Sequence, residues 1–190
     1  LAGLLSTFMR WETIEELNIY SGKWALERIS ELLHGVVLRG RPAPMPLNLN
    51  EIKPGVFFEA PDFTIQAFPV FHRGSDSLGF RFEERARRPF LAEKADALGV
   101  PQGPQRGELV AGEAITLEDG RIIQPDDVLG DLLKGLCYVH IGDAGRTEDL
   151  VAYCQGADAL VIESTYLEEE RELADQFSHL TARQAGALAA

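Results

Sequence analysis

The sequence predicts an α/β fold, and two observations support that prediction. In the C-terminal third, apolar stretches of strand length alternate with segments of helical pattern, in the order strand, helix, strand, helix. This alternation is typical of layered α/β domains. In the N-terminal part, residues 23–34 space their apolar side chains as a helix does, and later segments have the composition of strands.

Composition limits the possible classes of protein. The chain has 190 residues, 45% of them hydrophobic and 25% charged, which suits one globular domain with an appendage. Its formal net charge of −12 excludes a basic nucleic-acid-binding surface over the whole chain, but not a local basic patch. No apolar run approaches the ~20 residues of a membrane-spanning helix, so we expect no membrane association. Cys137 and Cys154 cannot form a disulfide framework, which indicates a reducing compartment such as the cytoplasm.

Residues 1–84 are predicted to form the first part of the core. Helices are expected at residues 1–9 and 23–34, the second ending at Gly35, and the prolines of residues 41–46 predict irregular backbone. Strands are expected at residues 17–20, 55–60, 63–71 and 78–82, the last after the polar turn GSDS.

Residues 85–131 differ from their surroundings, because four prolines and six glycines interrupt any amphipathic period. An irregular run of this length is uncommon inside a compact domain, so we interpret it as an insertion that leaves the core and returns. Within it, the sequence EDG between two short apolar segments predicts a hairpin. Between Arg85 and Arg106 there are five basic residues and only two acidic ones, which indicates a local basic patch.

Residues 132–190 are predicted to complete the core. Strands are expected at residues 136–141 and 159–163, and helices at residues 147–154 and 167–177. Thr181 is predicted to cap the last helix.

Ionisable side chains stand at the ends of three predicted strands. His72 and Asp143 follow two of the strands, and Glu163 ends a third. Ligands of layered α/β folds bind beyond the carboxyl ends of strands, so these side chains can meet at one edge of a sheet. Imidazole nitrogens and carboxylate oxygens are zinc ligands, and a carboxylate has two oxygens with which to bridge two metal ions. The three residues therefore form a candidate metal site.

Each of these residues also has a purely structural interpretation. His72 can be a hydrogen-bonded histidine, Asp143 a turn residue beside glycine, and Glu163 a buried carboxylate held by backbone amides or the cap of a turn. Among the remaining histidines, His179 lies in a short polar joint between two predicted helices, where it can reach a site or stay in solvent.

Five segments resemble, in chain order, the motifs of one known family. They correspond to a helix after a metal motif, a strand with a ligand histidine, an exosite arm with a Gly-Pro pair, a strand with a bridging aspartate, and late Glu and His motifs. The segments are LAGLLST, FPVFHRGSDSLGFRFEE, EKADALGVPQGPQRGELVAGEAITLEDGRII, YVHIGDAG, and ALVIESTY with SHLTARQAG. The family is ribonuclease Z, the tRNA 3′-end endonuclease of the metallo-β-lactamase superfamily. The arm is the most specific segment, because it distinguishes this family from the rest of the superfamily.

The resemblance implies a metallo-β-lactamase-like αβ/βα sandwich with an inserted arm. It implies a zinc-dependent endoribonuclease that removes the 3′ trailer from precursor tRNA by phosphodiester hydrolysis, with two zinc ions in the complete site. His72 would be a zinc ligand and Asp143 the carboxylate that bridges both ions. Glu163 and His179 would form a catalytic pair that aids proton transfer to the leaving oxygen.

The resemblance also assigns a role to the insertion and an assembly to the protein. Lys94, Gly103 and Pro104 would belong to a tRNA-binding arm, so precursor tRNA is the expected partner. The family further suggests a homodimer in which the arm of one subunit holds tRNA for the site of the other.

The sequence departs from the family pattern at several points. The HxHxDH motif and the last ligand histidine are absent, and the chain opens and closes inside helical patterns, so we expect an inactive fragment of a longer protein. Ile162 stands where a histidine commonly precedes the glutamate, and Leu180 stands where serine commonly follows the late histidine. Two alternatives therefore stay open: another hydrolase of the metallo-β-lactamase fold that acts on a small phosphodiester or ester, and a non-catalytic RNA-binding or dimerisation fragment.

Overall fold

The computed structural model of the chain describes residues 2–8, 14–43, 45–73 and 76–190. It divides the chain into two compact units, of which the first comprises Leu1–Glu83 and Cys137–Ala190 and the second Glu84–Leu136. Each unit has a hydrophobic core of its own. The chain leaves the first unit after Glu83 and returns to it at Cys137, whereas the insertion was expected at residues 85–131.

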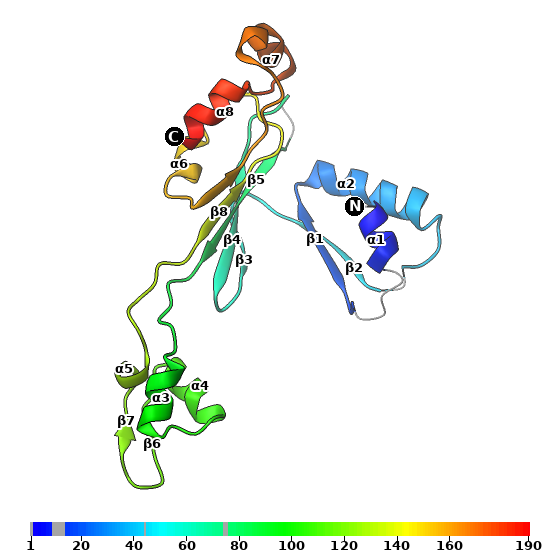
Figure 1. Ribbon diagram of the computed structural model, residues 1–190. Helices are drawn as coiled ribbons and strands as arrows, with labels where there is room; N and C mark the ends of the chain where they lie inside the picture. Colours follow the sequence, from blue (N-terminus) through cyan, green and yellow to red (C-terminus); the bar gives the residue numbers. More distant parts are fainter. Residues whose placement is uncertain (1, 9–13, 44, 74–75) are drawn as a thin grey trace. The chain divides into compact units, whose positions relative to one another are not determined.

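A five-stranded mixed sheet forms the centre of the first unit (Figure 1). Strand β3 pairs antiparallel with β4, β5 pairs antiparallel with β8, and β8 pairs parallel with β9. In sheet order the strands are β3 (Gly55–Glu59), β4 (Phe63–Pro69), β5 (Leu78–Glu84), β8 (Cys137–His140) and β9 (Ala159–Val161). Because β8 and β9 are parallel, their carboxyl ends lie at the same edge of the sheet.

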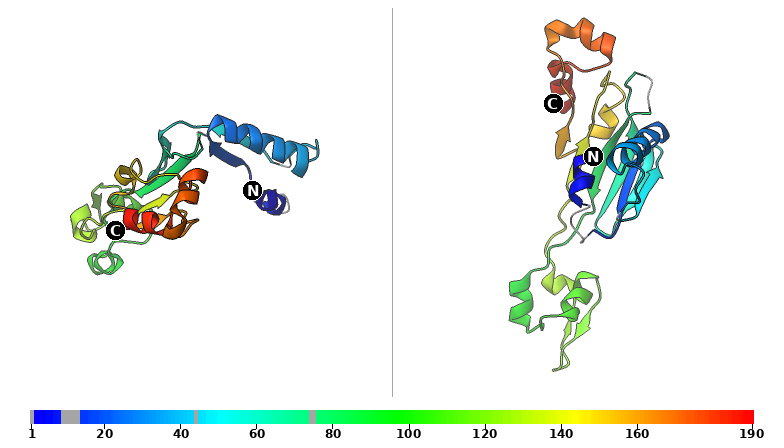
Figure 2. Two further views of the ribbon diagram at one scale, coloured as in Figure 1. Left: turned by 90° about the horizontal axis from the view of Figure 1, so that it is seen from above. Right: turned by 90° about the vertical axis from the view of Figure 1, so that its right-hand side faces the viewer.

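The core of this unit lies between the sheet and the helices after β8 and β9 (Figure 2). Phe68 of β4 and Val139 of β8 are fully buried together with Leu180, and the Phe68 ring stacks on Tyr153 with 4.3 Å between centroids. The helices are α6 (Val151–Cys154), the 3₁₀ turn η2 (Glu168–Glu170), α7 (Arg171–Phe177) and α8 (Ala182–Ala189). The apolar faces of β4 and β8 therefore fix the chain segments that leave the sheet toward the candidate site.

The N-terminal segment of the unit forms a second small core around Leu33 and Met45. Its elements are α1 (Ala2–Phe8), β1 (Leu17–Ser21), α2 (Lys23–Glu31), the π-helical turn η1 (Leu32–Val37) and β2 (Leu47–Glu51), with β1 and β2 parallel. Gly35 was expected to end the helix, which is wrong, because the chain continues through it in η1 to Val37. Leu1 and Met9 of the first expected helix, Pro44 of the irregular segment and residues 74–75 of the GSDS turn lie outside the described residues.

Strand β2 was not predicted, because its asparagines disfavour strands in general. Here the asparagine amides hydrogen-bond across the pair, with Asn48 Nδ2 3.0 Å from Asn18 Oδ1, while Leu47 and Leu49 alternate with them. The cross-strand amide contact compensates for the low intrinsic preference.

The second unit is not the irregular loop that its glycines and prolines predict. It contains α3 (Ala92–Leu98), α4 (Pro104–Val110), the hairpin of β6 (Ile115–Thr116) and β7 (Ile122–Ile123), and α5 (Pro125–Val128). The breaking residues lie at helix ends: Gly99 ends α3 at φ 79°, Gly103 precedes α4 at φ 128°, and Pro104 and Pro125 open helices. They therefore delimit short helices, and the predicted hairpin is present between two of them.

Two expectations in the last part of the chain have different outcomes. The helix expected from residue 147 is shorter, because residues 148–150 form a turn before α6 begins at Val151. The predicted cap is confirmed, since Thr181 Oγ1 accepts a hydrogen bond from the Gln184 amide at 3.3 Å.

Over the described part of the chain, no helix has both the length and the apolar character needed to cross a membrane.

Candidate metal centre

His72 lies just beyond the end of β4. The buried residues Phe68 and Val70 anchor the strand in the core, so the chain emerges at a fixed position before the histidine. The His72 side chain is 15% exposed, and its Nδ1 lies 2.9 Å from the backbone oxygen of Ser178. A carbonyl oxygen can only accept a hydrogen bond, so Nδ1 carries the proton and Nε2 of the neutral ring carries the lone pair.

Asp143 lies beyond the end of β8, in a loop that is held from both sides. Ile141 and Ala144 are buried on either side of it, and the Gly145 amide donates to the Phe71 oxygen at 2.7 Å. The Asp143 side chain itself is 64% exposed. Its carboxylate therefore faces open space from a fixed backbone, which suits a ligand that must reach an ion or a substrate.

Glu163 lies beyond the end of β9 and its carboxylate is almost buried, with 8% of the side chain exposed. It accepts hydrogen bonds from the Ala144 amide at 2.7 Å, from the hydroxyl of Thr165, and from Nδ1 of His179 at 2.8 Å. Burial raises the pKa of the Glu163 carboxyl, but these hydrogen bonds together outweigh burial and lower the pKa from its ordinary value. Glu163 is therefore a carboxylate at neutral pH and connects the Asp143 loop to His179.

His179 lies in the joint between α7 and α8. Ser178 ends α7 in the left-handed region, at φ 57° and ψ 47°, and the His179 amide donates back to the Ala174 oxygen at 2.9 Å. The buried Leu180 fixes the other side of the joint. His179 is 16% exposed, and the contact of its Nδ1 with Glu163 leaves Nε2 as the nitrogen that faces the site.

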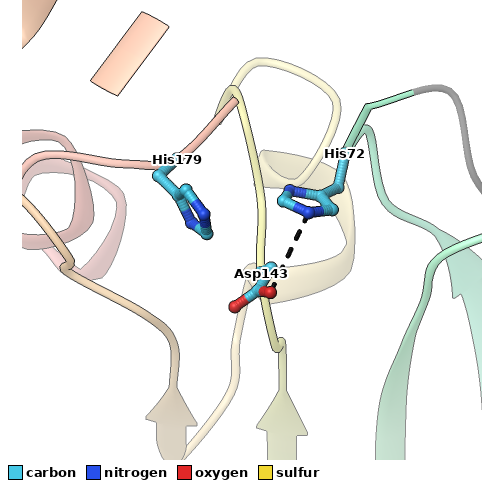
Figure 3. A group of neighbouring side chains, drawn as sticks. All are labelled: His72, Asp143 and His179. Carbon is cyan, nitrogen blue, oxygen red and sulfur yellow. Dashed lines mark ion pairs between the residues drawn. The ribbon is translucent and has the colours of Figure 1, made fainter. Parts of the chain in front are cut away.

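Three candidate ligands meet at this edge of the sheet (Figure 3). One ligand atom each of His72, Asp143 and His179 lies within 4.8 Å of the other two, and His72 Nε2 is 3.9 Å from Asp143 Oδ2. In both rings Nδ1 contacts an oxygen atom, the Ser178 carbonyl for His72 and the Glu163 carboxylate for His179. Proteins commonly orient metal-binding histidines by such a contact. Two imidazole lone pairs and a carboxylate thus converge, and this donor set fits zinc.

The space beside this cluster is open. A cavity of about 240 Å³ adjoins His72 and Asp143, and Leu78 and Phe80 of β5 contribute to its lining. A substrate group can therefore approach the ligand atoms from the side of β5.

The structure brings His72, Asp143, Glu163 and His179 together, whereas the sequence pattern grouped only the first three at strand ends. The pattern missed the contributions of Thr165, the Ala144 amide and the Ser178 carbonyl. Two of these are backbone groups, which no residue type or spacing in the sequence marks.

The predicted tRNA-binding residues all lie in the second unit. Lys94 is exposed on α3, and the exposed pair Gly103 and Pro104 opens α4.

The basic patch predicted between Arg85 and Arg106 has fewer available charges than the count of basic residues indicates. Arg88 binds Asp126 and the Gly130 oxygen, and Arg106 binds Asp96 and the Val100 oxygen. These two guanidinium groups hold the unit together.

Known proteins resemble the chain along its whole length. Ribonuclease Z of Bradyrhizobium diazoefficiens is 42% identical over 190 residues, and ribonuclease Z of Haloferax volcanii is 34% identical over 191 residues. Among solved structures, the short form of human tRNase Z matches with a TM-score of 0.60 at 16% identity. No family model matches the chain.

These matches confirm the resemblance to ribonuclease Z and the predicted metallo-β-lactamase-like α/β fold. Each covers 100% of the chain, but the chain spans 63% of the Bradyrhizobium protein, 59% of the Haloferax protein and 61% of the human chain. It therefore corresponds to less than two thirds of the length of these relatives.

Proposed function

We propose that this chain is part of a ribonuclease Z, a zinc-dependent endoribonuclease that removes the 3′ trailer from precursor tRNA. The observation that supports this most directly is the cluster of His72, Asp143 and His179 at the sheet edge, in a chain that resembles ribonuclease Z throughout. The cytoplasm is the proposed location, because both cysteines, Cys137 and Cys154, are free.

His72 and Asp143 are the proposed zinc ligands. Nε2 of His72 points toward the Asp143 carboxylate, and the exposed carboxylate offers two oxygens, so it can serve two ions. A zinc site usually has three or four protein ligands, so residues other than His72 and Asp143 must supply the remaining ones. When bound, a pair of zinc ions supplies an activated water and neutralises charge on the phosphate.

His179 is the proposed general acid. The Glu163 carboxylate accepts the Nδ1 proton of His179 and stabilises the positive charge of a doubly protonated ring. Such a ring can give its Nε2 proton to the departing ribose oxygen, and a positioned acid contributes a factor of about 10²–10⁴ to the rate.

Replacing His179 by Ala in the whole protein tests that assignment. We expect single-turnover cleavage of precursor tRNA to fall about 10²–10⁴-fold while the zinc content stays the same. His34→Ala is the matched control, because His34 is an exposed histidine in η1. Unchanged cleavage would remove His179 from the mechanism, and loss of zinc would assign it as a ligand.

Lys94, Gly103 and Pro104 are the proposed tRNA-binding residues of the second unit. Lys94 can contact a phosphate, and a chain turn with Gly103 and Pro104 presents little side-chain bulk to RNA. A homodimer is the proposed assembly, in which the second unit of one subunit serves the site of the other.

Cleavage of a transcript with a defined 3′ trailer tests the function as a whole. The whole protein should release the trailer at the discriminator nucleotide, lose this activity in a chelator and regain it with Zn²⁺. Hydrolysis of a small phosphodiester without cleavage of precursor tRNA would instead favour the other hydrolases of this fold. RNA binding without either activity would favour a binding module.

A further inference from the structure

Three chain segments are hydrogen-bonded to one another beside the candidate metal centre: residues 71–73, 143–145 and 177–178. The Arg73 side chain joins the first of them to the third. The Gly145 amide donates to the Phe71 oxygen at 2.7 Å, and His72 Nδ1 lies 2.9 Å from the Ser178 oxygen. Next to these contacts, Nε of Arg73 donates to the Phe177 oxygen at 2.9 Å. The carbonyls of two consecutive residues, 177 and 178, are thus bound by two consecutive side chains, 73 and 72.

The Ser178 carbonyl determines which nitrogen of His72 can bind a metal. Because this oxygen only accepts, it selects the tautomer with the proton on Nδ1 and leaves the lone pair on Nε2, on the side of Asp143. If the carbonyl turned away, both tautomers would be available to the ring. The donor set would then lose part of its preorganisation.

The backbone at Ser178 adopts an unfavourable conformation in this orientation of the carbonyl. Ser178 has φ 57°, a left-handed conformation that is unfavourable for a residue with a side chain. The joint is also crowded, since a Cβ on Gly145 would lie 3.0 Å from the Ser178 Cβ. The hydrogen bond of the His179 amide to the Ala174 oxygen holds the joint from within, and a further contact from outside it would help to keep the peptide in place.

Arg73 is placed to do this. Its guanidinium carbon lies 5.6 Å from the centroid of the Phe177 ring, and its Nε binds the carbonyl of the same residue, so it holds both the side chain and the peptide before Ser178. Its own backbone lies at φ 46°, directly after His72.

We propose that Arg73 is a positioning residue of the metal centre, which holds the 177–178 backbone so that the Ser178 carbonyl fixes His72 with Nε2 toward the metal. The proposal rests on the proposed function in one respect, that His72 binds metal. Arg73 itself contacts neither metal nor substrate in this role.

Three variants of the whole protein test the proposal. Arg73→Met keeps an unbranched apolar stem over the Phe177 ring but cannot donate, and Arg73→Lys keeps a donor. Arg171→Met is the matched control, because Arg171 is a half-exposed arginine in α7 whose partners are Glu168 and Asp175.

The first readout is the ¹⁵N spectrum of the His72 ring in metal-free protein at about pH 8, where an ordinary imidazole is neutral. We expect one tautomer, with the proton on Nδ1, in the parent protein and in Arg171→Met, and a mixture of both in Arg73→Met. Arg73→Lys should restore the single tautomer at least in part. A merely structural role of Arg73 would not shift this equilibrium.

The second readout is Zn²⁺ affinity, measured by competition with a chromophoric chelator. Arg73→Met should weaken Zn²⁺ binding about 10–100-fold, the usual effect of losing an outer partner of a ligand histidine, and Arg171→Met should leave it unchanged. An unchanged tautomer in a folded Arg73→Met protein would overturn the proposal. If Arg73→Met does not fold, Arg73→Leu, which also lacks a donor, takes its place: a mixed tautomer supports the proposal and a single one overturns it.

Failure of the proposed function gives a different result. If the parent protein binds no Zn²⁺, the metal centre is wrong, whereas the ¹⁵N spectrum still decides whether Arg73 fixes the tautomer of His72.

Discussion

At the scale of single residues, Glu163 is the group on which the candidate site depends most. Its carboxylate accepts from the Ala144 amide, the Thr165 hydroxyl and the His179 ring. Glutamine keeps one acceptor oxygen but turns an NH₂ group toward at least one of these donors. We therefore expect Glu163→Gln to lower the free energy of unfolding by about 1–3 kcal/mol at neutral pH and precursor tRNA cleavage about 10–100-fold.

The stability loss in Glu163→Gln should depend on pH. The folded-state pKa of Glu163 lies below its ordinary value of 4.5. The carboxylate therefore adds stability above about pH 4.5, and this stability is lost as the pH falls through the folded-state pKa. Urea unfolding of metal-free protein should show the largest difference from the parent near pH 7 and a smaller one in acid. A constant difference over this range would contradict the charge-dependent role. Glu169→Gln, at an exposed position in η2, serves as control.

The positions of the candidate site residues could be predicted from the sequence only for residues that directly follow a predicted strand. His72, Asp143 and Glu163 follow apolar stretches, and the carboxyl ends of β8 and β9 share an edge because these strands are parallel. His179 had no such signal, since a helical joint can point anywhere. The Ser178 carbonyl and the Ala144 amide are backbone groups, so only the folded chain reveals that they orient the site.

At the scale of elements, strand β5 depends on a glycine where it lies beside β4 in the sheet. A Cβ on Gly79 would lie 2.4 Å from the ring of Phe68, which is fully buried and stacked on Tyr153. Gly79→Ala must displace this ring, so we expect it to lower the free energy of unfolding by about 1–3 kcal/mol. Thermal and urea unfolding of the whole protein would measure the change.

Helix α8 provides the matched control for Gly79. Gly186 lies inside this helix, and a Cβ built there meets no atom within 4 Å. Gly186→Ala should therefore raise the free energy of unfolding by about 0.5–1 kcal/mol, because alanine loses less backbone entropy in a helix than glycine. Equal effects at the two positions would show that the contact with Phe68 does not limit β5.

The elements of the second unit explain why composition misled the prediction there. Glycine and proline predicted an irregular run, but in the folded unit they lie where helices begin and end, as at Gly99, Gly103 and Pro125. The helices are too short to show a clear amphipathic period, and their apolar residues, among them Ala95, Leu109 and Val128, form one small core. Short elements with tertiary contacts cannot be recognised from periodicity alone.

At the scale of the whole molecule, the two units have separate cores and are joined by two segments of chain. Among the described residues, the buried core of the sheet contains none between Glu84 and Leu136, and the core of the second unit contains none outside that range. Glu83 of β5 and Cys137 of β8 are cross-strand partners at the boundary. Antiparallel strands of this kind can be closed by a two-residue turn such as Asn-Gly.

Replacing Glu84–Leu136 by Asn-Gly in the whole protein therefore tests whether the first unit carries hydrolysis and the second unit carries tRNA binding. The sheet keeps its core and its candidate metal centre, so we expect cooperative unfolding, unchanged zinc content and unchanged hydrolysis of a small phosphodiester. If the second unit binds tRNA as proposed, binding of precursor tRNA should weaken roughly tenfold or more, because its phosphate contacts would be removed. Lys94→Ala, as a milder variant, should reduce the salt dependence of tRNA binding by about one phosphate contact. Equal loss of both activities in the shortened protein would mean that the second unit supports the site itself, since a separate tRNA-binding unit affects only the large substrate.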